Sequence, residues 1–180
     1  MAITDTLVKA FGVSKVKIFF DGDPMPYIGE LTMPDISAEV IEFDNTSTGG
    51  KIEVGDPWRR FFDGDGEIMI EADSSFLASK IFDATSIPTV RASMIVNNMS
   101  QQLGTFVPQV VDWVFQCQFY SVSPGTIKQG TKREITAKFK AFTAKLDING
   151  VNIFDYDIPN GKFLQNGVDL LTDITNLIGP

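Results

Sequence analysis

Residues 132–157 read KREITAKFKAFTAKLDINGVNIFDYD, and they set the expected fold class because they contain two strands and the turn between them. The apolar side chains of the first strand alternate on one face and then on the other: Ile135, Ala137 and Phe139, followed by Phe142, Ala144 and Leu146. A β-bulge produces such a change of face. Asn149-Gly150 is a strong hairpin signal. We therefore expect the chain to turn there and to return as a strand up to Asp157.

Further strands are predicted upstream of this hairpin. Residues 110–122 (VVDWVFQCQFYSV) place apolar side chains at odd positions and several polar ones at even positions, which indicates a half-buried strand. Shorter β-rich runs fill the first half of the chain, namely residues 15–20 before the turn at Asp21-Gly22, and residues 27–33, 36–44, 67–72 and 89–97. Residues 51–66 contain Gly55-Asp56-Pro57 and are predicted to be irregular.

Two segments show helical spacing. Residues 76–84 follow the capping sequence Asp73-Ser74-Ser75, and residues 166–178 place leucine and isoleucine on one helical face. The sequence therefore predicts a mainly β fold, a β-sandwich or half-barrel, with one central short helix and a short C-terminal helix. No repeat or linker divides residues 1–180, so we expect a single domain.

Composition excludes several classes of function. The chain has 180 residues, of which 43% are hydrophobic, enough for a folded core. Its 15 Lys and Arg against 23 Asp and Glu give a formal charge of -8, which disfavours wrapping of nucleic acid. Histidine is absent and cysteine occurs once, which removes the commonest general base, zinc cages and internal disulfides. We expect a protein that is not an enzyme, with no secretory leader and no membrane anchor.

Short acidic and glycine-rich motifs fail as binding sites. An EF-hand loop counted from Asp63 requires glycine at its sixth position and glutamate at its twelfth, where Ile68 and Ser74 stand. Thr48-Gly49-Gly50-Lys51 lacks the first glycine of a phosphate-binding loop. The carboxylates show no spacing that marks an acid/base pair. The sequence therefore predicts no catalytic, cofactor-binding or metal-ligating residue, and no cofactor.

Aromatic and arginine residues gather inside the segment expected to be irregular. They are Trp58, Arg59, Arg60, Phe61 and Phe62. Such a composition is typical of interface anchors. A loop folded onto its own core explains it equally well, and both readings stay open at this point.

A succession of motifs runs through most of the chain. The earlier ones are Ile18-Phe19-Phe20-Asp21-Gly22, Gly29, Leu31-Thr32-Met33-Pro34, Gly49-Gly50, the expected helix 76–84, Pro124-Gly125 and Gln129-Gly130. The most specific ones are C-terminal, namely Leu146-Asp147-Ile148-Asn149-Gly150, Ile153-Phe154-Asp155-Tyr156-Asp157, Asn160, Asn166-Gly167-Val168-Asp169-Leu170-Leu171 and Asn176-Leu177-Ile178-Gly179. This order resembles the major tail tube protein of contractile-tailed phages and of the related R-type bacteriocins.

The resemblance implies a tail-tube fold whose sheets join into a continuous barrel within a hexameric ring. Rings then stack into the hollow inner tube of a contractile tail or phage tail-like particle, a conduit for DNA or ions. The N-terminal segment 1–14 and the loop 43–66 are the expected assembly elements, with Trp58, Arg59, Arg60, Phe61 and Phe62 as ring-stacking anchors. The implied partners are further copies of the chain, the surrounding sheath, and baseplate and tail terminator proteins. DNA enters only as passing cargo, and assembly is expected in the bacterial cytoplasm, as part of a virion tail or released particle.

The polar faces of the strands are candidates for the lumen of such a tube. The candidate lumen-facing residues are Glu67, Glu71, Arg91, Ser93, Gln116 and Gln118. The same alternation also fits an ordinary solvent face. An acidic lumen keeps passing DNA from binding, because walls of like charge do not pair with phosphates.

Two alternatives stay open at this level. One is the secreted tube component of a type VI-like secretion system, which has a similar size and a mixed β fold. The other is a small β-barrel protein that binds an apolar ligand. Rings or long polymers separate both tube functions from the monomeric barrel.

Overall fold

The structure is a computed structural model that describes residues 8–25, 28–45, 50–70, 81, 83, 85–100, 105–125, 128–130 and 134–170. Its strands, in chain order, are Val8–Phe20 (β1), Asp23–Pro24 (β2), Ile28–Thr32 (β3), Asp35–Asn45 (β4), Gly50–Asp63 (β5), Gly66–Ile70 (β6), Thr89–Ser100 (β7), Thr105–Ser123 (β8), Ile135–Ile148 (β9), Val151–Asp157 (β10), Lys162–Gln165 (β11) and Val168–Asp169 (β12). Most of the described chain is strand, so the mainly β prediction is confirmed.

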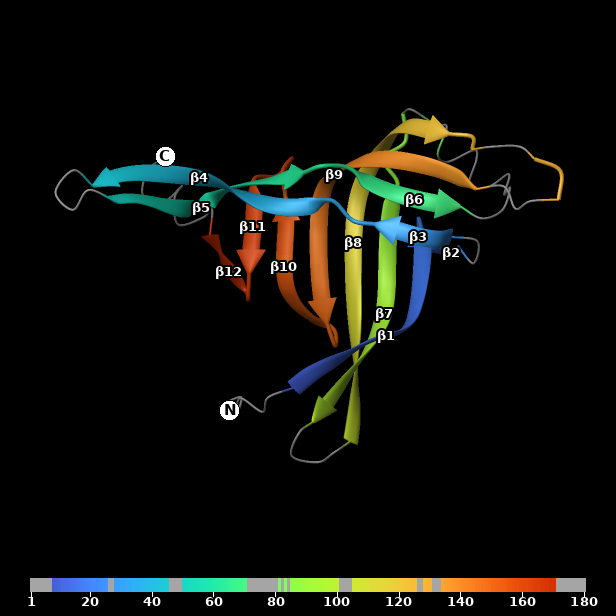
Figure 1. The fold of residues 1–180 in the computed structure, drawn as a ribbon, viewed down its shortest axis with the longest axis horizontal. Helices are drawn as coiled ribbons and strands as arrows, with labels where there is room; N and C mark the ends of the chain where they lie inside the picture. Colours follow the sequence, from blue (N-terminus) through green and yellow to red (C-terminus); the bar gives the residue numbers. More distant parts are fainter. Residues whose placement is uncertain are drawn as a thin grey trace.

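One antiparallel sheet organises the molecule, with strand order β12-β11-β10-β9-β8-β7-β1-β2. Strand β9 belongs to two parts of this sheet. Its first half pairs with β6, from Ile135 opposite Ile70 to Phe139 opposite Gly66, and its second half pairs with β10. Strand β6 in turn pairs with β3. The sheet bends at β9, so that β3 and β6 cross in front of β7 and β8 (Figure 1). The result is a half-barrel.

The bulge predicted from the change of apolar face lies in β9. Gln116 of β8 is opposite Thr143, whereas Cys117 is opposite Ala141, so Phe142 is the extra residue. The buried side chains of β9 are Ala137, Phe139, Ala141 and Ala144. Their spacing changes by one residue at Phe142, and this keeps both halves of the strand turned toward apolar partners.

Three hairpins turn on an Asp-Gly or Asn-Gly pair. In Asp21-Gly22, Asn149-Gly150 and Asn166-Gly167 the first residue has φ of 50°, 51° and 52°, and each glycine also has positive φ. This is the geometry of tight type I′ turns. The first two turns were predicted and are confirmed.

The third turn corrects the predicted helix 166–178 at its beginning. Asn166-Gly167 reverses the chain, and Val168 then pairs with Gln165 as the start of β12. Both turn residues adopt left-handed backbone angles, which a helix does not accommodate. Residues beyond Leu170 lie outside the described chain. The predicted helix 76–84 also lies outside it, apart from Ile81 and Asp83.

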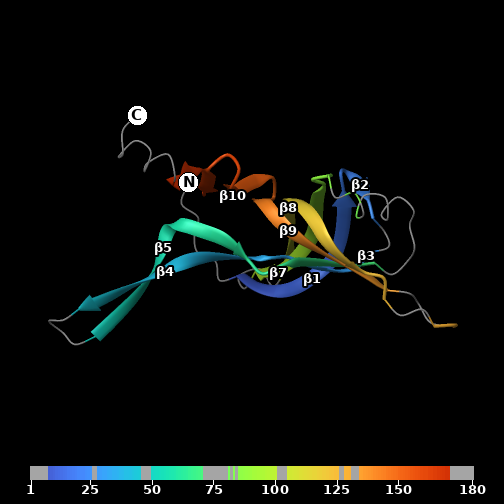
Figure 2. The same ribbon diagram turned by 90° about the horizontal axis from the view of Figure 1, so that it is seen from above.

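The predicted irregular segment 51–66, and with it the loop 43–66, is largely a strand. Strands β4 and β5 form a two-stranded antiparallel ribbon that projects from one end of the molecule (Figure 2). Ala38 lies opposite Arg60, and Val40 lies opposite Gly55. Residues 56–59 are therefore accommodated in one large bulge. Glycine and proline tolerate the bulge without ending the strand, and this is why the breaker residues gave the wrong prediction.

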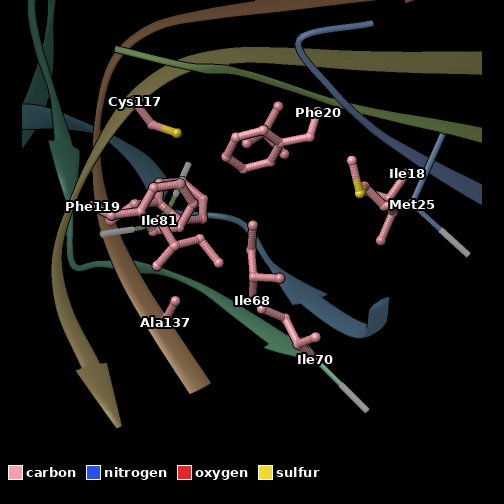
Figure 3. Close-up of a cluster of buried hydrophobic side chains, with 11 residues drawn as sticks. Ile18, Phe20, Met25, Ile68, Ile70, Ile81, Cys117, Phe119 and Ala137 are labelled. Carbon is pink, nitrogen blue, oxygen red and sulfur yellow. The ribbon is translucent and has the colours of Figure 1, made fainter. Parts of the chain in front are cut away.

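Two apolar clusters fill the concave side of the sheet. The larger cluster lies between β1, β7 and β8 on one side and β6 and β9 on the other (Figure 3). Its members are Ile18, Phe20, Met25, Ile68, Ile70, Ile81, Val90, Cys117, Phe119, Ala137 and Phe139. The smaller cluster joins Phe115, Ala141 and Ala144 to the base of the ribbon through Ile36 and Phe62. These contacts anchor the ribbon at its base.

No helix in the part of the chain that the structure describes is long and apolar enough to cross a membrane.

Candidate functional site

The convex face of the sheet carries five of the six lumen candidates. Arg91 and Ser93 flank the buried Ala92, Gln116 and Gln118 flank the buried Cys117, and Glu67 precedes the buried Ile68. Successive residues of a strand point to opposite faces. These five residues therefore lie on the side away from both apolar clusters, called the polar face below. Glu71 lies outside the described residues.

Strand register makes the polar face continuous from one strand to the next. Ser93 of β7 lies opposite Asp112 of β8, and Gln118 lies opposite Lys140 of β9. Glu67 of β6 lies opposite Lys138. The predicted residues are thus parts of one surface, and sequence alternation separated the polar from the buried side of each strand; that this surface faces a lumen stays a prediction.

Ion pairs run across this polar face. They are Arg91 with Asp112 (3.0 Å), Lys138 with Glu67 (3.9 Å), Lys140 with Asp65 (2.5 Å), Lys145 with Asp147 (2.8 Å) and Lys162 with Asp155 (2.5 Å). Each is at least partly exposed, so each contributes little to stability. Their main effect is on the surface potential of the polar face. Each positive charge in a pair lies beside a negative charge, so their potentials largely cancel.

Two carboxyl groups in these ion pairs, those of Asp65 and Asp147, have pKa values that their hydrogen-bond partners lower. Hydrogen bonds from Lys140 and then Tyr120 hold the pKa of Asp65 below its ordinary value. At Asp147, burial acts to raise the pKa, but hydrogen bonds from Lys145 and Asn152 outweigh burial and leave the pKa lowered. Both groups are therefore charged over the neutral range.

Half of the acid excess of the chain lies on the ribbon. Residues 35–63 contain seven acidic and three basic residues. The polar face, by contrast, interleaves opposite charges. The expectation of an acidic lumen therefore does not follow from the formal charge of -8, since that number describes the whole chain and not this surface.

The predicted stacking anchors do not form a single patch. The Tyr156 hydroxyl donates a hydrogen bond to the Arg60 carbonyl oxygen, and the Phe62 ring centroid lies 5.3 Å from that of Tyr156. The Arg60 guanidinium lies 5.3 Å from the centroid of Phe163. Arg60 and Phe62 thus pack the ribbon base against β10 and β11.

The other anchors have a different placement. Phe61 is 44% exposed and is available for contact with another molecule. Trp58 and Arg59 lie within the bulge of β5, and their side chains lie outside the description. Whether these residues contact another ring stays a prediction.

Sequence reasoning missed the exposed apolar residues in the outer half of the ribbon. Ile41 pairs with Val54 across the ribbon, and their side chains are 39% and 47% exposed. Glu42 and Glu53 are directly opposite each other on the other face. The alternation in residues 40–43 (VIEF) and 51–54 (KIEV) was the available signal. For residues 51–54 the prediction of an irregular segment, based on Gly55-Asp56-Pro57, took precedence over this alternation.

The single cysteine has no exposed thiol. Cys117 is fully buried, and burial, followed by the nearby charge of Asp21, raises its pKa to about 12. A thiol in this state is a poor nucleophile. Among the described residues, no cluster of three or more His, Cys, Asp or Glu side chains could hold a metal ion.

The fold is similar to that of chains in solved structures of contractile injection systems. One match is a chain of the sheath/tube terminator of PVC, an extracellular contractile injection system, in its extended state (TM-score 0.56, 11% identity, covering 76% of this chain and 95% of that one). A second is a chain of the PVC sheath-tube complex (TM-score 0.51, 10% identity, covering 74% and 88%). A third belongs to the tube-terminating cap of the anti-feeding prophage (TM-score 0.52, 12% identity, covering 82% and 99%). These structures share the fold.

The sequence itself gives the family. The family described as Phage tail tube protein FII matches residues 12–179, and the chain belongs to this family. It is a structural tail tube protein, and the prediction of a contractile-tail tube protein is confirmed. No curated protein matches the sequence.

Proposed function

We propose that copies of this chain close into hexameric rings that stack into a hollow tube. The observation that carries the proposal is the open edge of the half-barrel. Within the described chain, β1 has β7 on one side, while its other side pairs with β2 at Phe19 and Phe20 and accepts one more backbone hydrogen bond, from the Met25 N–H to the Ile18 carbonyl oxygen. Long unpaired edges invite further strands. A closed ring of copies covers such edges.

The polar face is the surface proposed to line the channel. The concave face is occupied by the two apolar clusters and by the base of the ribbon, so the convex face is free to border a water-filled lumen. Its interleaved ion pairs give a weak field, and a weak field lets polyanions or ions pass without binding. The chain then acts as a conduit wall without catalytic chemistry.

The ribbon is proposed as the element that reaches other copies, with Phe61 contributing at its base. The sheath is proposed to surround the tube, and baseplate and terminator proteins to bound its ends. Assembly is proposed to take place in the bacterial cytoplasm, before the particle is released.

Electron microscopy of the purified full-length chain, alone and co-expressed with its genetic neighbours, tests the proposal. We expect rings with six-fold symmetry and tubes with a continuous central channel. A particle mass that stays monomeric over a wide range of concentration and salt, also with the neighbours present, would contradict it.

A further inference from the structure

Among the described residues, the polar face has two basic residues that form no ion pair. Lys15 and Lys17 lie on β1, and Lys17 is opposite Ser93 in the register, which places it on the polar face. The basic residues of β7, β9 and β11 on this face form the ion pairs given above. Among the described residues, neither Lys15 nor Lys17 has a carboxylate within ion-pair distance. Both lie on the strand with the open edge.

An apolar groove borders the same edge. It lies between β1 and β3, has a volume of about 610 Å³ and is lined by Val16, Ile18, Met25, Leu31, Met33 and Met94. Lys17 and Glu30 also contribute to its wall. Val16 is 52% exposed. The edge of β1 therefore presents apolar side chains on one face and uncompensated lysines on the other.

The outer half of the ribbon has the complementary pattern. On β5, Val54 is 47% exposed on the apolar face, and Glu53 stands on the opposite face. Glu53 lies directly across from Glu42, and like charges in that position destabilise a strand pair. Lys51 lies 3.5 Å from Glu42. Glu53 has no such cation within the described chain.

We propose that strand β5 of the ribbon of one copy adds to the open edge of β1 in another copy. In this arrangement the Val54 side chain enters the groove beside Val16, and Glu53 lies beside Lys17 on the polar face. Main-chain hydrogen bonds supply affinity and the alternate side chains supply register, as in other cases of strand addition. This inference rests on the proposed function and names the segment that covers one of the open edges.

Strand β5 is favoured over β4 by charge. Glu42 of β4 already has Lys51 near it, whereas Glu53 gains its first cation at Lys17. Both faces of the added strand then match β1, apolar against apolar and acidic against basic. A slip of one residue reverses every side chain, which brings Glu53 against the apolar groove.

Charge exchange in the full-length chain tests the pairing. Lys17→Glu and Glu53→Lys are each expected to raise the concentration needed for tube formation by about tenfold, and the double exchange is expected to restore it. Glu42→Lys combined with Lys17→Glu is the matched control and is not expected to restore assembly. Lys128→Glu, the same charge change at an exposed position beside the turn at residues 129–130, controls for net charge.

The stability of each variant is measured separately by thermal unfolding, at a protein concentration too low for tubes to form. Glu53→Lys removes the opposition to Glu42, so the protomer is expected to unfold no earlier than the parent. Loss of tubes with retained folding therefore reports assembly.

A cysteine pair tests the geometry. In assembled Val16→Cys/Val54→Cys, mild oxidation is expected to give covalent multimers on a non-reducing gel, since a disulfide needs the two Cβ atoms within about 4.5 Å. Val16→Cys/Val40→Cys is the control, because Val40 is 58% exposed but lies on the other face of the ribbon. The native Cys117 is buried and does not interfere.

The outcomes separate the two proposals. If the parent chain forms neither rings nor tubes, the proposed function fails. If the parent forms tubes but the Val54 pair does not cross-link, or the charge exchange does not restore assembly, only the β5-to-β1 contact is overturned. Cross-linking through Val40 instead of Val54 also overturns it.

Discussion

The substitution Gly66→Ala tests whether close packing between β6 and β9 stabilises the half-barrel. Gly66 begins β6 directly opposite Phe139 of β9. A Cβ atom added at Gly66 comes within 2.0 Å of the Phe139 ring, with two more ring atoms at 2.2 and 2.6 Å. The backbone angles of Gly66 are not in the left-handed region, so alanine is acceptable to the backbone. The effect of Gly66→Ala is therefore steric.

The size of the effect follows from that contact. Carbon atoms in contact normally lie about 3.5–4.0 Å apart, so the ring must move by about 1.5 Å. Phe139 is fully buried and packs edge-on against Phe119 at 5.6 Å, which leaves little room for that movement. Overpacking of this kind costs about 3 kcal/mol, and the entropic gain of alanine over glycine returns about 0.4–1 kcal/mol. We expect a net loss of about 2 kcal/mol.

Urea unfolding of the dilute protomer measures this loss. With a dependence of about 2 kcal/mol per molar urea, the midpoint is expected to fall by about 1 M. Gly55→Ala is the matched control, because its added Cβ lies at an ordinary 3.5 Å from the Ala38 Cβ. The double variant Gly66→Ala/Phe139→Leu is also informative. We expect its free energy of unfolding to be at least about 1 kcal/mol higher than the sum of the two single effects predicts. A Gly66→Ala midpoint equal to that of the control, or strictly additive effects, refutes the reasoning.

Three further predictions concern single groups. The folded pKa of Asp65 is lowered from 3.8 by Lys140 and Tyr120, so its stabilising contribution is complete above about pH 4 and is lost as the pH falls through the folded pKa. Unfolding midpoints measured against pH are expected to show this acid-dependent loss in the parent, and a smaller one in Asp65→Asn. Cys117 is expected to react with a thiol reagent only at the rate of unfolding, and fast labelling of the native protein contradicts its burial. Asn166→Ala is expected to cost about 1 kcal/mol because its φ is 52°, whereas Asn166→Gly keeps the turn. Equal urea midpoints for these two variants refute the turn argument.

Alternation and turn chemistry predicted most of the sheet. The bulge at Phe142 and the turns at Asp21-Gly22 and Asn149-Gly150 were predictable because each depends on a local rule with one physical cause. Arg91 and Gln116 were separated from the buried side of the sheet because strand periodicity alone determines which residues share a face. These features need no knowledge of distant partners.

The errors occurred where long-range pairing outweighs local preference. Gly55-Asp56-Pro57 breaks strands in general, but pairing along β4 confines the break to one bulge. The leucines after Asn166 suit a helix, but the turn at Asn166-Gly167 is set by backbone angles that hydrophobic spacing does not report. The inward packing of Arg60 and Phe62 depends on β10 and β11, about a hundred residues later in the sequence, which local composition does not reveal.

The opposed glutamates of the ribbon also affect the chain before it assembles. A ribbon with Ile41 and Val54 exposed has an apolar face and free strand edges, which favour aggregation among newly made copies. Two ribbons that meet edge to edge in register bring four glutamates together, so repulsion opposes this pairing. The charge proposed to pair with the lysines of β1 is thus also expected to oppose association of unassembled copies through their ribbons.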